Sequence, residues 1–202
     1  MVARGGLNWP SKYCEKTQEA AFINTEQPGR PFGPRNGGAG RVSLLTLVGF
    51  LGLTLLVGAA DAAITATSVH GWYLSLTQPP GTPPNWLFGP VWTVLYAMIA
   101  VAAWLVWRRG VMSGGEQRTQ PALRLWGWQL LANAAWTPAF FGLHSTVLAV
   151  AVIAVLVVLI AVTARAFARI SRPAALLMLP YLAWSCYAAY LSAGFLWLNP
   201  HA

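Results

Sequence analysis

Polar and aromatic side chains recur at helical spacing within otherwise apolar parts of this sequence. Gln129 and Asn133 lie four residues apart and Trp136 follows three residues later, so a helix would carry all three on one face. An unpaired amide in hydrocarbon costs on the order of a few kcal/mol, so these side chains need a partner on another helix, a water or a ligand. The spacing therefore predicts either interhelical hydrogen bonds or part of a binding site.

Two further stripes have the same character. Trp92 and Tyr96 form an i, i+4 aromatic pair, and Trp184, Ala188 and Leu191 recur at i, i+4 and i+7. Such walls suit planar, largely apolar molecules, because ring stacking and buried area give affinity while a few polar groups set orientation. Ordinary helix packing and, for some tryptophans, a belt at the membrane interface are the alternative interpretations.

Asp61 is the only acid within any long apolar stretch. A carboxylate near the centre of a membrane helix costs roughly 3 kcal/mol on insertion scales, so we expect it to face protein or water. Its role is either structural, as a hydrogen-bonded carboxyl, or functional, as a proton-coupling site or a counter-charge for a ligand. No nucleophile, metal cluster or acid–base pair is visible, so neither catalytic residues nor a metal site nor an obligatory cofactor is expected.

The segment from Trp72 to Tyr96 reads WYLSLTQPPGTPPNWLFGPVWTVLY and runs from a loop directly into an apolar helix. The loop contains four prolines, Pro79, Pro80, Pro83 and Pro84. Proline holds the backbone near extended or polyproline geometry, so this loop is ordered at low entropic cost. We therefore expect the segment of residues 72–86 to form a stiff lid over a pocket.

Composition places the chain in lipid. Its 202 residues are 56% hydrophobic and 9% charged, with a mean hydropathy of +0.53, which ordinary soluble domains do not show. Five apolar stretches are near or above the roughly 20 residues that cross hydrocarbon, where only helices satisfy their own backbone. They lie at about residues 42–69, 86–107, 122–143, 146–168 and 174–198. The sequence predicts an all-α integral membrane protein, a bundle of five transmembrane helices.

Charge gives the expected topology. All 13 basic residues precede the first stretch or lie around the second-to-third and fourth-to-fifth connections. Because cytoplasmic loops are rich in Lys and Arg, we expect a cytoplasmic N-terminus and an outside C-terminus. The net charge of +8 then reflects topology and contact with anionic lipid, without a nucleic-acid partner. A bacterial plasma membrane is favoured, with the mitochondrial outer membrane as the alternative.

The first 41 residues differ from the rest. Gly, Pro, Asn and scattered charges give them no helical or strand period. We expect residues 1–41 to be a disordered basic cytoplasmic tail and residues 42–199 to be the membrane domain. The two cysteines, Cys14 and Cys186, have no metal-binding spacing.

Three segments together resemble one known family. The Trp72–Tyr96 segment, WGWQLLANAAWTPAFFG at 126–142 and LPYLAWSCYAAYLSAGFLWLN at 179–199 occur in the order found in the tryptophan-rich sensory protein and translocator protein (TspO/MBR) family, also called the peripheral-type benzodiazepine receptor family. The similarity covers about residues 44–199. It implies a five-helix bundle, often a homodimer, whose cavity under the first loop accepts porphyrins such as protoporphyrin IX and haem-like tetrapyrroles, and cholesterol or synthetic drugs in mitochondrial members.

The resemblance also implies which residues contact the ligand. Carried over by motif position, these are Tyr73, Pro83, Trp92, Tyr96, Asn133, Trp136, Trp184, Ala188 and Leu191. Gln129 joins them as a neighbour of Asn133 on the same helical face. The chain departs from the family pattern at Gln78, where a basic residue is usual, and at Ala193 and Trp197, where mitochondrial members have their cholesterol consensus.

Three functions follow as hypotheses. The first is a membrane receptor, sensor or transporter that binds porphyrins in a cavity lidded by residues 72–86. The second is a light-dependent porphyrin-degrading enzyme, an activity that the resemblance implies and that would use the pigment's own photochemistry. The third is a proton-coupled exporter in which Asp61 alternates between proton and substrate. We expect a receptor or transporter rather than an enzyme.

Overall fold

The computed structural model describes residues 36–68 and 71–200. The backbone separates into two units, residues 1–38 and 39–202, and the contacts below all lie within the second. Most of the predicted tail at residues 1–41 falls outside the described residues, so its disorder stays a prediction. Its last residues are helical, because the first described helix begins at Asn36.

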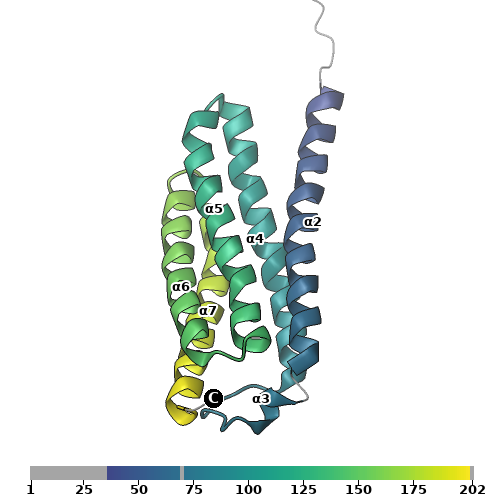
Figure 1. Cartoon of the computed structure of the whole chain (residues 1–202). Helices are drawn as coiled ribbons and strands as arrows, with labels where there is room; N and C mark the ends of the chain where they lie inside the picture. The colour runs from purple at the N-terminus through teal and green to yellow at the C-terminus, as the bar shows by residue number, and fades with distance from the viewer. Residues whose placement is uncertain (1–35, 69–70, 201–202) are drawn as a thin grey trace, which may run out of the picture. The chain divides into compact units, whose positions relative to one another are not determined.

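The described residues form helices and no strands (Figure 1). The long helices are α2 (Asn36–Ser68), α4 (Asn85–Ser113), α5 (Glu116–Thr137), α6 (Thr146–Ala168) and α7 (Arg172–Leu198). The short α3 (Trp72–Ser75) precedes α4, and a π-helical turn, η1 (Pro138–Gly142), follows α5. The all-α prediction is confirmed for this part of the chain.

The predicted count of five transmembrane helices is confirmed only in part. Within the described residues, four helices are long and apolar enough to cross a membrane: Gly40–Ser68 of α2, α4, α6 and α7. Helix α5 lacks the required hydropathy because its first turns carry Gln117, Arg118, Gln120 and Arg124. The composition of α5 therefore leaves the fifth span a prediction, although the four apolar helices support an integral membrane protein.

Helices α4 to α7 pack around a common apolar core. Its fully buried members include Ile99 and Val106 on α4, Leu156 and Ile160 on α6, and Met178 on α7. Lipid tails are as apolar as these side chains, so in a membrane the stabilisation comes from close packing between the helices. The core thus holds α4, α5, α6 and α7 together as the fixed part of the bundle.

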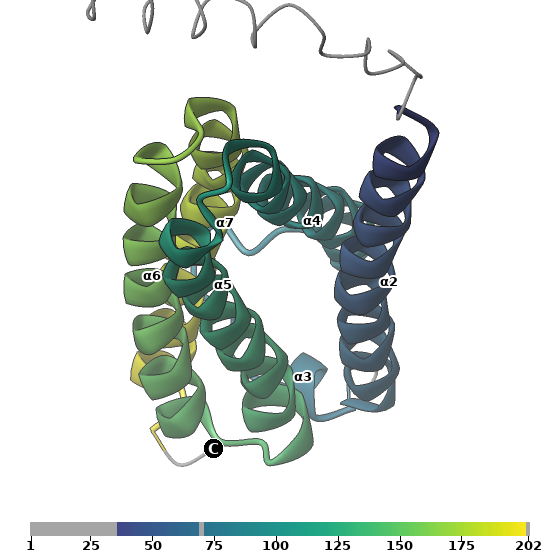
Figure 2. The same ribbon diagram turned by 90° about the horizontal axis from the view of Figure 1, so that it is seen from above.

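Helix α2 lies beside α4, on the side away from α6 (Figures 1 and 2). Many of its large apolar side chains are exposed, namely Val42, Leu44, Leu45, Val48, Leu53, Leu55 and Leu56. It meets α4 closely at two points: Trp104 Nε1 donates to the carbonyl of Ser43 at 2.9 Å, and a Cβ at Gly58 would lie 2.7 Å from Tyr96 Cε2. Close contact at a few points leaves space along the rest of α2.

The two ends of the bundle differ in charge. The α4–α5 and α6–α7 connections and the start of α2 lie at one end, and α3, the 72–86 segment and η1 lie at the other (Figure 1). The described arginines belong to the first end: Arg41, Arg108, Arg109, Arg118, Arg124, Arg165, Arg169 and Arg172. The structure thus places the basic residues as the topology argument requires, while the membrane side that each end faces stays a prediction.

Candidate ligand-binding site

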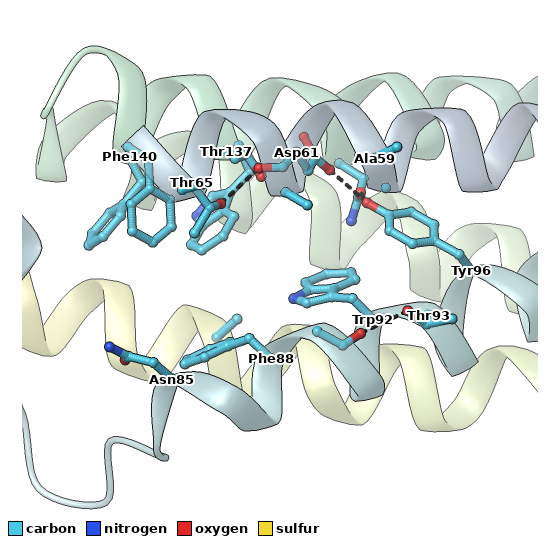
Figure 3. Close-up of a pocket in the computed structure, with 18 of the residues that line it drawn as sticks. Ala59, Asp61, Thr65, Asn85, Phe88, Trp92, Thr93, Tyr96, Thr137 and Phe140 are labelled. Atoms are coloured by element: carbon cyan, nitrogen blue, oxygen red, sulfur yellow. Dashed lines mark hydrogen bonds between the residues drawn. The ribbon is translucent and has the colours of Figure 1, made fainter. Parts of the chain in front are cut away.

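A cavity of about 680 Å³ lies between α2, α4, α5 and α7, and its lining includes Tyr73, Asn85 and Trp86 of the 72–86 segment. This volume is within the range of about 300–1,000 Å³ that is usual for small-molecule sites. The close-up in Figure 3 shows Asp61 and Thr65 on α2 facing Phe88 and Trp92 on α4 across it. The cavity reaches the surface at Trp86, which lines it and is 72% exposed.

Aromatic rings form much of the cavity wall. Trp136 and Phe140 stack with centroids 5.7 Å apart and an interplanar angle of 13°, while Trp92 lies 5.6 Å from Tyr96. Phe141 packs edge-on against Phe140 at 4.9 Å. Stacked and edge-on rings at these distances are the favourable arrangements of aromatic pairs.

The π-helical turn η1 brings Phe140 and Phe141 to the wall. Proline at position 138 cannot continue the hydrogen-bonding pattern of α5, and the chain forms a wider turn in which Leu143 N bonds the carbonyl of Pro138 at 2.8 Å. Ser145 then caps α6 by accepting a hydrogen bond from Leu148 N at 3.3 Å. The wider turn presents two consecutive rings to the same region, which a regular helix would spread apart.

Polar groups form a hydrogen-bonded chain across the bundle. Tyr96 Oη lies 2.7 Å from Asp61 Oδ2 on α2 and 2.6 Å from Asn133 Oδ1 on α5. Asn133 Nδ2 in turn donates to Tyr181 Oη on α7 at 3.0 Å. Asn133 and both tyrosines are buried, and Asp61 is half-buried at the cavity. The carboxyl predicted to need a protein partner therefore has one.

The 72–86 segment is fastened to α7. Asn199 holds the backbone of Thr77 from both sides: its Nδ2 donates to the Thr77 carbonyl at 3.0 Å, and its Oδ1 accepts from Thr77 N at 2.8 Å. The hydroxyls of Tyr187 and Tyr190 donate to the carbonyls of Gly81 and Pro80. The segment is therefore held on α7, and its role as a lid over the cavity stays a prediction.

Close backbone approach supports the same attachment. A Cβ at Gly194 on α7 would lie 2.6 Å from Pro79 Cβ, so glycine is required where the segment crosses α7. Gly81 has φ of +84°, a conformation that other residues rarely adopt. Both glycines therefore fix the path of the proline segment.

Tyr73 joins the segment to the cavity. It is buried and packs against Phe140, Phe141 and Phe195. Burial raises the pKa of Tyr73, and the neighbouring Tyr187 raises it further, so the phenol stays neutral at physiological pH. Tyr73 thus offers the cavity an uncharged aromatic face.

Most of the predicted contact residues meet at this cavity. The structure places seven of them, together with Asp61, in its lining: Tyr73, Trp92, Tyr96, Asn133, Trp136, Ala188 and Leu191. Because α2, α3, α4, α5 and α7 all contribute, sequence spacing within one helix could not have shown that these faces converge. Their contact with a ligand stays a prediction.

Three predicted residues lie outside the lining: Pro83, Gln129 and Trp184. Gln129 and Trp184 each lie one helical turn before the first lining residue of α5 and α7, which are Asn133 and Ala188. Trp184 packs on Phe88 and Tyr187 instead. Gln129 is fully buried, and within the described residues its amide has no hydrogen-bond partner.

Other lining residues escaped sequence reasoning. They include Gly58, Ala59 and Ala62 on α2, Asn85, Trp86 and Phe88 at the start of α4, Thr137 at the end of α5, Phe140 and Phe141 on η1, and Phe195 on α7. The small residues of α2 give no polar or aromatic signal. The two phenylalanines depend on the π-helical turn, which helical periodicity does not predict.

Comparison with known proteins gives consistent matches. The model of the TspO/MBR family matches residues 50–198. The tryptophan-rich protein TspO of Chlorobaculum tepidum is 38% identical over 161 residues, which cover 78% of this chain and 98% of that protein. The translocator protein of Bos taurus is 35% identical over 145 residues, which cover 72% of this chain and 85% of that protein. The tryptophan-rich sensory protein of Cereibacter sphaeroides is 34% identical over 149 residues, which cover 73% of this chain and 90% of that protein.

Proposed function

Because the chain belongs to the TspO/MBR family, whose members are named as sensory and translocator proteins, we propose that it is a membrane receptor that binds a porphyrin such as protoporphyrin IX. The proposed site is the cavity under the 72–86 segment. The family membership supports the sensor or receptor role in general terms. The more specific proposal, that the ligand is a porphyrin, is argued from the cavity.

The observation that carries the porphyrin proposal is the aromatic wall. A porphyrin is a broad, flat, mostly apolar ring, and its affinity must come from stacking and from buried area. Trp92 lies on one side of the cavity, and the parallel rings of Trp136 and Phe140 lie on another. Few polar groups interrupt these faces, so they favour a flat apolar guest over a sugar or a nucleotide.

The bundle geometry supports entry of an apolar ligand without a large rearrangement. The 72–86 segment is bonded to α7, whereas α2 touches α4 at a few points, so the side of the cavity nearest α2 is the less tightly closed side. We infer that the ligand passes beside Trp86, at the end of the 72–86 segment, so the strength of the segment's attachment to α7 sets how readily this passage opens. A homodimer, five spans and a bacterial plasma membrane remain part of this proposal.

Titration of the purified full-length protein tests the proposal. Protoporphyrin IX, haem and cholesterol are added separately, and quenching of tryptophan fluorescence is followed. We expect protoporphyrin IX to bind more tightly than cholesterol, and Trp136→Leu to weaken porphyrin binding by about tenfold, since loss of one stacked ring costs on the order of 1–2 kcal/mol. Trp197→Leu serves as the control, because Trp197 is 85% exposed and absent from the lining. Equal effects of the two substitutions would contradict the site.

Two other functions remain as candidates on the same cavity. A light-dependent porphyrin-degrading enzyme would place the pigment between the same rings, and illumination of the complex would then bleach the pigment only when protein is present. A proton-coupled exporter would use the hydrogen-bonded chain that starts at Asp61, and porphyrin flux in liposomes would then follow a pH gradient. Absence of bleaching removes the first, and flux independent of the gradient removes the second.

A further inference from the structure

The described residues that line the cavity include one acidic side chain and no basic side chain. Among the described residues that line it, Asp61 is the only one with a carboxyl group, and none is Lys, Arg or His. The sequence contains no Lys or Arg between Arg41 and Arg108, between Arg124 and Arg165, or after Arg172, and these are the segments that form the wall. An anionic group on a ligand would therefore find no counter-charge here.

Asp61 is placed to meet a ligand. It lies on α2 at the cavity, is half-buried, and points toward the rings of α4 (Figure 3). The groups that face it are hydroxyls and an amide: Tyr96 from α4, Thr137 from α5, and Asn133 through Tyr96. None of these is a cation that could neutralise it. A carboxylate in such surroundings attracts a hydrogen-bond donor or a positive charge strongly, because little water screens it.

The number of hydrogens available to the hydrogen-bonded chain of Asp61, Tyr96, Asn133 and Tyr181 limits the ways in which its members can pair. Tyr96 has one hydroxyl hydrogen, yet its oxygen lies within hydrogen-bond distance of both Asp61 Oδ2 and Asn133 Oδ1. If Asp61 is protonated, it donates to Tyr96, Tyr96 donates to Asn133 Oδ1, and Asn133 Nδ2 donates to Tyr181. If Asp61 is ionised, Tyr96 donates to Asp61, the Asn133 amide turns by about 180° so that its NH₂ donates to Tyr96, and Tyr181 donates to the Asn133 carbonyl.

These hydrogen-bonded side chains therefore let Asp61 be either protonated or ionised without leaving any of them unpaired. In the ionised state the carboxylate accepts from Tyr96 and keeps further lone pairs for a donor on the ligand. In the protonated state Asp61 uses its only hydrogen on Tyr96, and it has no hydrogen left for an acceptor on the ligand. Either state disfavours a ligand carboxylate at this position, and the ionised state favours an N–H donor.

We propose that Asp61 determines which ligands the cavity accepts: it selects planar apolar molecules that present a protonated amine or another N–H donor toward α2, over otherwise identical molecules that present a carboxylate there. This inference rests on the proposed function, because it concerns the same cavity, and it requires protoporphyrin IX to bind with its two carboxylates turned away from Asp61. It identifies Asp61 as the specificity-determining residue and names the ligand class by charge.

The test uses three porphyrins with the same ring, whose two side chains end in a carboxylate, a methyl ester or a primary ammonium. Each is titrated into the full-length protein at pH 7, and tryptophan quenching gives the affinity. We expect the ammonium form to bind at least about tenfold more tightly than the carboxylate form, since a hydrogen bond to a partly buried charge is stronger than one between neutral groups and the carboxylate has no such partner. In Asp61→Asn the two should bind within about twofold of each other, with the ester nearly unchanged.

Two controls make the result specific. Thr46→Val removes a hydroxyl of α2 that is bonded to the carbonyl of Val42 and lies outside the lining, and it should keep the ammonium preference. Affinity for the ammonium form should rise with pH as Asp61 ionises and should lose this slope in Asp61→Asn. The other titratable groups that face the cavity, Tyr73 and Tyr96, are phenols, which do not ionise at the acidic to neutral pH over which a carboxyl group titrates.

The outcomes separate the two proposals. Equal affinities for the ammonium and carboxylate forms, with tight binding of the ester, would overturn the role of Asp61 and leave porphyrin binding intact. A preference that survives in Asp61→Asn would overturn it equally. Failure of all three porphyrins to bind would overturn both proposals.

Discussion

At the residue scale, the contrast between Asn133 and Gln129 is the most informative. Both are buried amides on one face of α5. Asn133 bonds Tyr96 and Tyr181 and lines the cavity, whereas Gln129 lies one turn away with no partner among the described residues. A buried amide without a partner costs about 1–3 kcal/mol. The sequence placed both on one face, but only the neighbouring helices decide which one reaches the cavity.

We predict that Gln129→Met stabilises the protein. Methionine has a similar length and removes the unpaired amide, so the free energy of unfolding should rise by about 1–3 kcal/mol. Thermal unfolding in detergent would show a higher Tm, with porphyrin affinity unchanged.

Asn133→Leu is the matched comparison, because it breaks hydrogen bonds to two tyrosines. We expect it to lower both Tm and porphyrin affinity. A loss of affinity in Gln129→Met at constant Tm would contradict the structure, since it would mean that Gln129 contacts the ligand.

At the element scale, the 72–86 segment is attached to α7 by hydrogen bonds. Its prolines were enough to predict stiffness, and the resemblance implied a cavity beneath it. The attachment could not be predicted, because Thr77 and Asn199 are far apart in sequence and the contact depends on how α7 ends. The same limit applies to η1, where helical periodicity gave no reason to expect a wider turn.

We predict that Asn199→Ala speeds ligand release. The substitution removes two hydrogen bonds that hold Thr77, which together contribute about 1–3 kcal/mol, so the dissociation rate of protoporphyrin IX should rise by about fivefold or more. Stopped-flow recovery of tryptophan fluorescence after mixing with excess detergent micelles measures this rate.

Ser113→Ala is the control, since it removes a hydrogen bond to the carbonyl of Arg109 at the opposite end of the bundle. It should leave the dissociation rate unchanged. If Asn199→Ala also leaves the rate unchanged, ligand exit does not depend on the attachment of the 72–86 segment.

At the scale of the whole molecule, three of the four packed helices, α4, α5 and α7, enclose with the loosely attached α2 a site that none of them forms alone. Hydropathy and charge predicted an all-helical membrane protein with its arginines at one end, and both features are present in the described residues. They could not give the position of α2, because its exposed apolar side chains are compatible with lipid on any face. The cavity depends on that position.

The most direct test of ligand binding in the cavity compares the labelling of two neighbouring positions on α7. Ala188 lines the cavity, whereas the native Cys186, two residues earlier, is exposed and absent from the lining. In a Cys14→Ser background, Ala188→Cys is treated with a membrane-permeant maleimide, and labelling at both cysteines is followed by peptide mass spectrometry. We expect protoporphyrin IX to slow labelling at position 188 and to leave labelling at Cys186 unaffected. Equal labelling at position 188 with and without the porphyrin would contradict it.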